Sequence, residues 1–206
     1  MGRNQTFDTA DAVRAARAVF WAQGYEATAL PDLERATGLS RSSIYHAFAS
    51  KRGLFDAAVD SYLDEVIRPR LRPLTGDDVA PGALDDYLTG LRDALLRGDT
   101  LPATSGCLLV NSANAPIGHD EGVAAVVEAY AAELRQAMTA GVRARLPHLP
   151  AEAQRTLSDV CVGLVISAFA LVRVNREEAA RTLDTARAVL ASAVAHAGAG
   201  DGGSPA

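Results

Sequence analysis

The sequence predicts an all-α protein with an N-terminal three-helix head and a larger helical C-terminal domain. Hydrophobic residues make up 49% of the 206 residues and aromatic residues only 5%, and many Ala and Leu residues favour a core of packed helices. Apolar residues recur at three- and four-residue spacing in segments that end at Gly or Pro, as helices do. Near the N-terminus, two such segments join through one glycine.

The first helix of the head is expected from Thr9 to Gln23. Asp8 or Thr9 can cap its start, and Gly24 ends it. The inward face is defined by apolar residues at helical spacing, namely Val13, Ala16 and Phe20. We expect Trp21 and Tyr25 to pack against the next helices.

A helix-turn-helix is predicted between residues 30 and 48. The apolar positions of its first helix are Leu30, Leu33 and Ala36. Gly38 stops that helix because it adopts a positive φ without a Cβ clash, and Ser40 can cap the second helix. Ile44 and Phe48 lie four residues apart and form the inward pair of the second helix. Two short helices joined by a short glycine turn define the motif.

The charge around this motif differs from that of the whole chain. The chain carries a net charge of −5, whereas residues 35–52 contain four Arg or Lys and no Asp or Glu. A local basic surface on an acidic protein favours docking on DNA phosphates through one motif over general coating of DNA.

Three runs carry the motif and its flank: Thr37-Gly38-Leu39-Ser40, Ile44-Tyr45-His46 with Phe48, and Ser50-Lys51-Arg52-Gly53-Leu54-Phe55. Their order and spacing resemble the DNA-binding signature of the TetR family of bacterial transcriptional repressors, and the resemblance covers about residues 9–60. Two residues depart from the family pattern. Glu34 stands where the family usually has a small residue, and Ala29 stands where relatives often have Ser or Thr.

The resemblance implies a domain layout and a DNA-contacting set. We expect a helix-turn-helix DNA-binding domain over residues 1–50, a ligand-binding and dimerisation domain over 51–197, and a disordered tail over 198–206. Arg41 is the candidate for guanine because its planar fork fits O6 and N7. The complete predicted set for double-stranded operator DNA is Thr28, Ser40, Arg41, Ser42, Ser43, Tyr45, His46 and Lys51.

Six further helices are expected in the C-terminal domain. A fourth helix should run from residue 51 to 68 until Pro69 and Pro73 break it. The remaining expected ranges are 82–97, 105–115, 120–146, 151–172 and 176–197.

The last two helices predict a homodimer. Residues 160–172 are uncharged and mainly apolar, and a helix that is apolar on nearly all sides is buried on most of them. Two helices from each of two chains would complete a four-helix interface, as the resemblance implies. The alternative is that both helices are buried within one subunit. The predicted interface residues are Leu164, Ala168, Leu171, Leu183, Leu190 and Val194.

We also expect a pocket for an unknown small-molecule effector among the fourth to seventh helices. It should be mainly apolar with a few polar groups, although ordinary core packing is the favoured interpretation of any single candidate. The candidates are Tyr62, Val66, Leu88, Leu91, Cys107, Asn111, Asn114, Val127, Tyr130 and Phe169. The sequence leaves the effector, the target genes and the choice between repressor and activator open.

Cys107 offers an alternative kind of sensor. The run Gly106-Cys107-Leu108-Leu109 resembles a branch of the TetR family in which a cysteine here senses electrophiles or oxidants. A helix N-terminus, with Ser105 as its cap, would lower the pKa of the thiol. The apolar neighbours favour the opposite interpretation, an inert buried cysteine. Cys161 is interpreted as packing.

Other function classes lack support in the sequence. No phosphate-cradling loop, metal-ligand spacing or catalytic constellation is recognisable, so an enzyme is a remote alternative and no cofactor or metal is expected. The N-terminus lacks a hydrophobic signal core, and the longest uncharged apolar run has thirteen residues, too few to span a bilayer. We therefore expect a cytoplasmic protein with no membrane partner.

Overall fold

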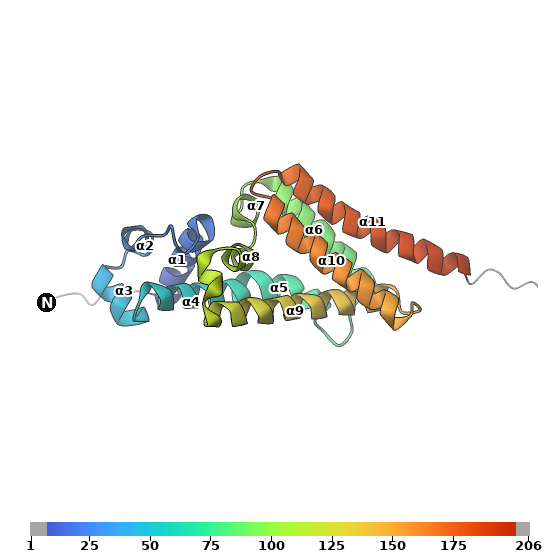
Figure 1. Cartoon of the computed structure of the whole chain (residues 1–206), viewed down its shortest axis with the longest axis horizontal. Helices are drawn as coiled ribbons and strands as arrows, with labels where there is room; N and C mark the ends of the chain where they lie inside the picture. The colour runs from blue at the N-terminus through green and yellow to red at the C-terminus, as the bar shows by residue number, and fades with distance from the viewer. Residues whose placement is uncertain (1–7, 201–206) are drawn as a thin grey trace, which may run out of the picture. The chain divides into compact units, whose positions relative to one another are not determined.

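The computed structural model describes residues 8–200, with side chains up to residue 195, and within this range it contains helices and turns but no strand. The all-α prediction is confirmed (Figure 1). The elements are α1 Thr9–Gln23, α2 Leu30–Thr37, α3 Arg41–Phe48, α4 Lys51–Tyr62, the π-helical turn η1 Leu63–Ile67, α5 Arg68–Leu71, the 3₁₀ turn η2 Arg72–Leu74, α6 Ala83–Arg97, α7 Leu101–Ser105, α8 Leu108–Ala113, the 3₁₀ turn η3 Pro116–His119, α9 Glu121–Arg145, α10 Ala151–Leu171 and α11 Arg176–Gly200.

The three helices of the head begin and end where their local chemistry predicts. Asp8 caps α1 by accepting the backbone N–H of Ala10 at 2.9 Å, and Gly24 ends the helix at φ 83°. The core of the head contains the predicted Val13, Ala16 and Phe20, all buried. Trp21 and Tyr25 pack against other helices as expected: the Trp21 ring contacts Tyr62 of α4, and the Tyr25 ring contacts Phe20 of α1 and Phe55 of α4.

The prediction that Pro69 breaks the fourth helix is wrong. The helix widens into the π turn η1 and then continues as α5, which contains Pro69. Proline removes one backbone donor and crowds the carbonyl four residues earlier. A π turn is a local change of hydrogen-bond pattern that occurs at helix irregularities. Here η1 lies just before Pro69, so the hydrogen-bond pattern changes locally and the helix continues past the proline.

The chain divides into two compact units. Among the described residues, the first comprises residues 8–69 and 107–124, and the second comprises residues 70–106 and 125–200. The first unit therefore combines the head and α4 with the segment from α8 to the start of α9. These units are defined by contacts within the chain and not by function. The expected functional domains, residues 1–50 and 51–197, stay a prediction.

The segment from residue 105 to 115 is not the single short helix that we expected. It consists of α7 and α8, separated by Gly106 at φ 71° and by Cys107. A Cβ at Gly106 would lie 2.5 Å from the carbonyl oxygen of Phe169. Only glycine fits this combination of positive φ and close backbone approach, so the chain turns there and Ser105 ends α7 instead of capping α8.

In the second unit α6, α10 and α11 pack side by side (Figure 1). The apolar stripe of α11 faces α6 and α10 and is buried within the chain, including Leu183 and Leu190. Two cross-helix ion pairs reinforce this packing: the Arg187 guanidinium donates to both carboxylate oxygens of Asp85 at 3.0 and 3.2 Å, and Arg92 pairs with Asp184 at 3.1 Å. The helix continues to Gly200, so residues 198–200 are helical, while the remainder of the predicted disordered tail lies outside the described residues.

Within the single chain, helix α10 is buried on one side only. The expectation that it is buried on most sides includes a partner chain and stays a prediction. Val160 and Ile166 are about one third exposed, and Val174, just beyond the helix, is 87% exposed. By length and composition α10 could cross a membrane, which the thirteen-residue run did not indicate, but core helices of soluble proteins share this property. Exposed apolar side chains that gather on one side of a helix typically mark an interaction surface.

Candidate nucleic-acid interface

Backbone and side-chain hydrogen bonds within the turn between α2 and α3 fix the start of α3, the second helix of the motif, which we call the recognition helix. Gly38 lies in the left-handed region at φ 70°, and its N–H donates to the carbonyl of Glu34. The Thr37 hydroxyl donates to the Leu33 carbonyl at 2.7 Å and accepts the N–H of Leu39 at 3.2 Å. Ser40 caps α3 by accepting the N–H of Ser43 at 3.2 Å. The motif predicted from the sequence is therefore present with its expected glycine stop and serine cap.

Helix α3 presents one polar face to solvent. Ile44 is fully buried, whereas Phe48, its predicted inward partner, is only half-buried. The face opposite Ile44 contains no acidic residue. The predicted DNA-contacting residues that are exposed on this face are Ser40, Arg41, Ser42, Tyr45 and His46, and Ser43 is half-buried at the edge of the face. The Arg41 guanidinium lies over the Tyr45 ring at 5.8 Å, a cation–π contact that limits the orientations of both side chains.

Lys51 is held beside this face by an aromatic ring. Its Nζ lies 4.3 Å from the centroid of Tyr25, and Tyr25 is itself packed against Phe20 and Phe55. Burial lowers the pKa of Lys51 below its usual range, because a charged ammonium is less stable away from water. The lysine is thus a positioned cation at the start of α4, directly after the recognition helix.

Two of the four Arg and Lys residues between positions 35 and 52 form ion pairs. Arg35 pairs with Asp32 one turn earlier on α2. Arg52 pairs with Asp56 at 2.7 Å and with Asp120 at 2.7 Å. Residues 35–52 contain no acid, but acidic residues outside this range neutralise Arg35 and Arg52. Most of the positive charge that remains available to DNA therefore comes from Arg41 and Lys51.

Thr28 does not join the exposed set. Its side chain is only 1% exposed, and its hydroxyl donates to the Gly24 carbonyl at 2.6 Å. This bond closes the loop between α1 and α2 from inside. Ala29 is the N-cap residue of α2 and offers no side-chain cap. Its backbone N–H donates to the Asp32 carboxylate at 3.1 Å, which is the half of a capping box that does not require Ser or Thr at the N-cap.

A second set of contacts ties the head to the segment that precedes α9. The Glu26 carboxylate accepts the N–H of Ile117 at 2.7 Å. Asp120 caps α9 by accepting the N–H groups of Gly122 and Val123 and also binds Arg52. The hydrogen bond from Arg52 is the main reason that the pKa of Asp120 falls to about 2. The loop before α2 and the start of α4 are therefore both fastened to η3 and the start of α9.

The predicted effector-binding residues fall in both compact units. In the first unit, Tyr62 and Cys107 are buried, Val66 and Asn111 are half-buried, and Asn114 is exposed with its amide bound to the Val110 carbonyl. In the second unit, the buried candidates are Leu88, Leu91, Tyr130 and Phe169, with Val127 half-buried. Two surface hollows lie elsewhere, one on α9 and one between α10 and α11, and none of these candidates lines either hollow.

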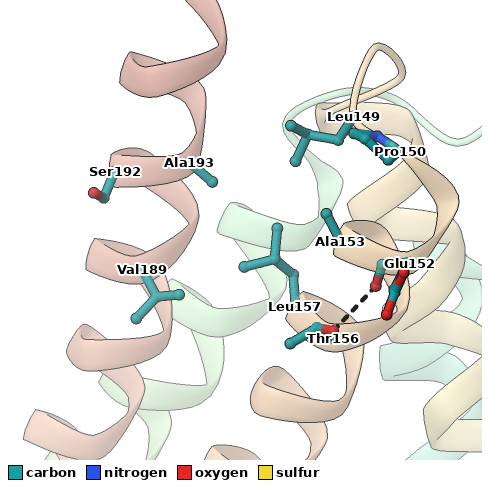
Figure 2. Close-up of a pocket in the computed structure, with 9 residues that line it drawn as sticks. All are labelled: Leu149, Pro150, Glu152, Ala153, Thr156, Leu157, Val189, Ser192 and Ala193. Carbon is teal, nitrogen blue, oxygen red and sulfur yellow. Dashed lines mark hydrogen bonds between the residues drawn. The ribbon is translucent and has the colours of Figure 1, made fainter.

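The hollow between α10 and α11 is an open groove of about 840 Å³. Figure 2 shows Leu157 and Ala153 on α10 opposite Val189 and Ala193 on α11, with polar groups at the edges. The exposed or half-exposed α10 positions 160, 164, 167 and 171 follow Ala153 and Leu157 at helical spacing. The groove and this stripe together form one apolar face, which we call the α10–α11 face.

Three of the predicted interface residues do not lie on the α10–α11 face. Ala168, Leu183 and Leu190 are fully buried within the single chain, because the repeat on α11 packs against α6 and α10. Leu164 and Leu171 are half-buried, and Val194 is 43% exposed. The sequence left two alternatives open, burial within one subunit or burial in a dimer, and Ala168, Leu183 and Leu190 are buried within the one chain.

The described side chains offer no metal centre: among them, no three His, Cys, Asp or Glu residues gather closely enough to hold an ion. Cys161 is fully buried, and burial raises the pKa of its thiol to about 11. Its interpretation as a packing residue agrees with this environment.

Comparison with known proteins gives consistent relatives. Residues 12–58 match the family model of bacterial regulatory proteins of the tetR family. The chain is 37% identical over 112 residues to the HTH-type transcriptional repressor ComR of Escherichia coli K12, a match that spans about half of each chain (54% and 52%). It is 34% identical over 149 residues to the HTH-type transcriptional regulator YezE of Bacillus subtilis 168, covering 69% of this chain and 72% of that one.

Solved structures show the same fold over most of the chain. A cysteine mutant of the TetR family regulator CifR in complex with a 26-bp operator DNA matches with a TM-score of 0.73 and 27% identity, covering 90% of this chain and 97% of that one. SCO4454 from Streptomyces coelicolor matches with a TM-score of 0.71 and 20% identity, covering 89% and 94%. The fold and motif define a helix-turn-helix regulatory protein. The chain belongs to the TetR family of bacterial regulatory proteins.

Proposed function

We propose that this protein is a ligand-responsive transcriptional repressor that binds a palindromic operator as a homodimer. The observation that carries the proposal is the exposed, acid-free face of α3 with Arg41 at its start, flanked by Lys51. In a helix-turn-helix, the N-terminal residues of the second helix read base edges in the major groove. The named activities of ComR as a repressor and of CifR as an operator-bound regulator agree with this role.

Six of the eight predicted residues take roles that fit their positions. Arg41 reads guanine through O6 and N7, and its contact with Tyr45 limits its orientations before binding. Ser42 is an adaptable donor to bases or phosphates, and Ser40 serves mainly as the helix cap. Lys51, held over Tyr25, binds a backbone phosphate. Thr28 supports the loop from inside rather than touching DNA through its hydroxyl.

The α10–α11 face supports the homodimer. It combines apolar side chains such as Val160 and Leu164 with small ones such as Ala153 and Ser167, which allow a second helix to approach closely. A twofold interface uses the same patch on both chains, and helices from two copies would complete a four-helix arrangement. Two recognition helices in one dimer then match two half-sites about one helical turn apart, or a multiple of it.

Effector control acts through the contacts between the head and the segment from α8 to α9. A small, mainly apolar molecule that favours one arrangement of this segment changes the positions of Glu26 and Arg52, because Ile117 and Asp120 hold them. Coupling between such sites is typically ~1–3 kcal/mol. We expect the effector to release the repressor from DNA. We also expect a cytoplasmic protein without enzymatic activity.

Thiol sensing through Cys107 is a second candidate, favoured by one observation. Cys107 sits at the N-terminal end of α8, in the same compact unit as the recognition helix. Its complete burial opposes access by reagents, so a non-covalent effector is the preferred proposal. Operator release by hypochlorite or an alkylating agent, compared between wild type and Cys107→Ser, separates the two: only a sensor loses the response in the variant.

The DNA proposal is tested with a duplex that the wild-type protein selects from a randomised library, and with a scrambled duplex of the same length. Selected binding is expected at ~10⁻⁸–10⁻¹¹ M. Arg41→Ala should cost ~1–3 kcal/mol and relax one base position, whereas Lys51→Ala should weaken both duplexes alike and reduce the salt slope by about 1.

Arg97→Ala is the matched control, because it removes a cation from the exposed end of α6 in the other compact unit. It should change neither duplex affinity. Equal affinity of the wild type for selected and scrambled duplexes would refute sequence-specific binding.

A further inference from the structure

Glu34 makes a contact with the recognition helix that no other carboxylate provides among the residues described. It lies on α2, at the position where the family usually has a small residue. Its Oε1 accepts the backbone N–H of Arg41 at 2.6 Å across the glycine turn. Arg41 is the first residue of α3, so this N–H is one of those that have no partner within the helix.

The first turn of α3 contains no acidic residue of its own. Its other recorded cap is Ser40, whose neutral hydroxyl accepts the N–H of Ser43. Glu34 therefore supplies the negative charge that complements the positive end of the helix dipole. An uncapped helix N-terminus is a ready-made binding site for phosphate, and in this chain the carboxylate takes that place.

From this contact we infer that Glu34 is a specificity-determining residue of the DNA-reading head. It has two effects: it positions the start of α3, including the backbone of Arg41, and it keeps a negative charge at the helix end that would otherwise attract any DNA phosphate. The first effect favours the correct sequence, and the second disfavours all others. This inference rests on the proposed DNA-binding function and identifies a residue that controls its selectivity.

Two substitutions separate the effects. Glu34→Gln keeps an amide oxygen that can accept the Arg41 N–H but removes the charge. Glu34→Ala removes both the acceptor and the charge. Asp60→Asn is the control, because it removes one exposed negative charge from the same compact unit, more than two helical turns along α4 from Lys51.

The assay is fluorescence anisotropy with the selected and scrambled duplexes at several salt concentrations. A charge at a helix terminus is worth ~0.3–1 kcal/mol, so Glu34→Gln should bind the scrambled duplex about two- to fivefold more tightly than wild type. Its affinity for the selected duplex should change less, which lowers the ratio of the two affinities. Glu34→Ala should lose affinity for the selected duplex, and glutamine at this position should retain it.

Failure of this inference is distinct from failure of the proposed function. If wild type prefers the selected duplex but Glu34→Gln binds both duplexes as wild type does, Glu34 does not set selectivity. An equal gain for Asp60→Asn would indicate a general effect of net charge and would also overturn the inference. Thermal unfolding checks that Glu34→Ala is folded, and the isosteric glutamine variant gives a decisive result even where alanine unfolds the head.

Discussion

Substitution of Gly53 by alanine should destabilise the junction between the recognition helix and α4. Gly53 lies in the first turn of α4, where its N–H donates to the Ser50 hydroxyl at 3.0 Å. A Cβ at this position would lie 2.0 Å from the carbonyl oxygen of Phe48, the last residue of α3, and 3.2 Å from its carbonyl carbon. Real Cβ atoms essentially never approach closer than 3.0 Å, so the two helices would have to separate by about 1 Å.

The cost can be estimated from two opposing terms. Overpacking typically costs ~1–3 kcal/mol, and the upper end applies because the obstructing atom belongs to the backbone of a helix end. Alanine gains ~1 kcal/mol over glycine in a helix interior. The net loss is therefore about 2 kcal/mol, which lowers the melting temperature of a chain of this size by roughly 4–8 °C. Operator affinity should fall as well, because Lys51 and α3 no longer keep their spacing.

Circular dichroism of thermal and urea unfolding measures the loss, with Gly90→Ala as a matched control. Gly90 also lies within a helix, but a Cβ there would meet no atom within 4 Å, so alanine should stabilise α6 by up to ~1 kcal/mol. The reasoning is refuted if Gly53→Ala is as stable as wild type, or if both glycine variants shift in the same direction.

Three further perturbations have defined outcomes. Leu164→Arg places a charge on the α10–α11 face and should give a folded monomer by light scattering that loses operator binding, whereas Leu96→Arg on α6 should stay dimeric; a dimeric Leu164→Arg would exclude this face. Ala49 is a non-glycine residue at φ 62°, so Ala49→Gly should raise stability by about 0.5–1 kcal/mol in urea unfolding, after subtraction of the entropy that glycine adds to the unfolded chain. The lowered pKa of Asp120 means that its contribution is complete above its unfolded pKa of about 3.9 and is lost as the pH falls towards about 2; Asp120→Asn should therefore flatten the fall in melting temperature between pH 5 and 2, and an unchanged pH profile would disprove the role of its pair with Arg52.

The helix-turn-helix could be predicted because its signals are local. Asp8, Gly38 and Ser40 act on backbone groups within a few residues of themselves, so their roles follow from sequence order. The same reasoning failed at Pro69, because the π turn before it changes the hydrogen-bond pattern, and the helix continues although proline has no backbone N–H. It also missed Glu34, since a carboxylate seven residues from Arg41 reaches that residue only when the turn places α2 beside the start of α3.

The sequence by itself determined the all-helical class, most helix boundaries and the motif that reads DNA, because caps, glycine stops and apolar periodicity act over short distances. Tertiary structure decided which partners those helices have. Leu183 is buried and Val160 is partly exposed although both belong to apolar helical repeats, because periodicity identifies an apolar face but not the helix that covers it. In the same way, Asp56 lies one turn from Arg52 in the sequence, but only the fold brings Asp120 to that arginine, since this ion pair forms through space between residues far apart in the chain.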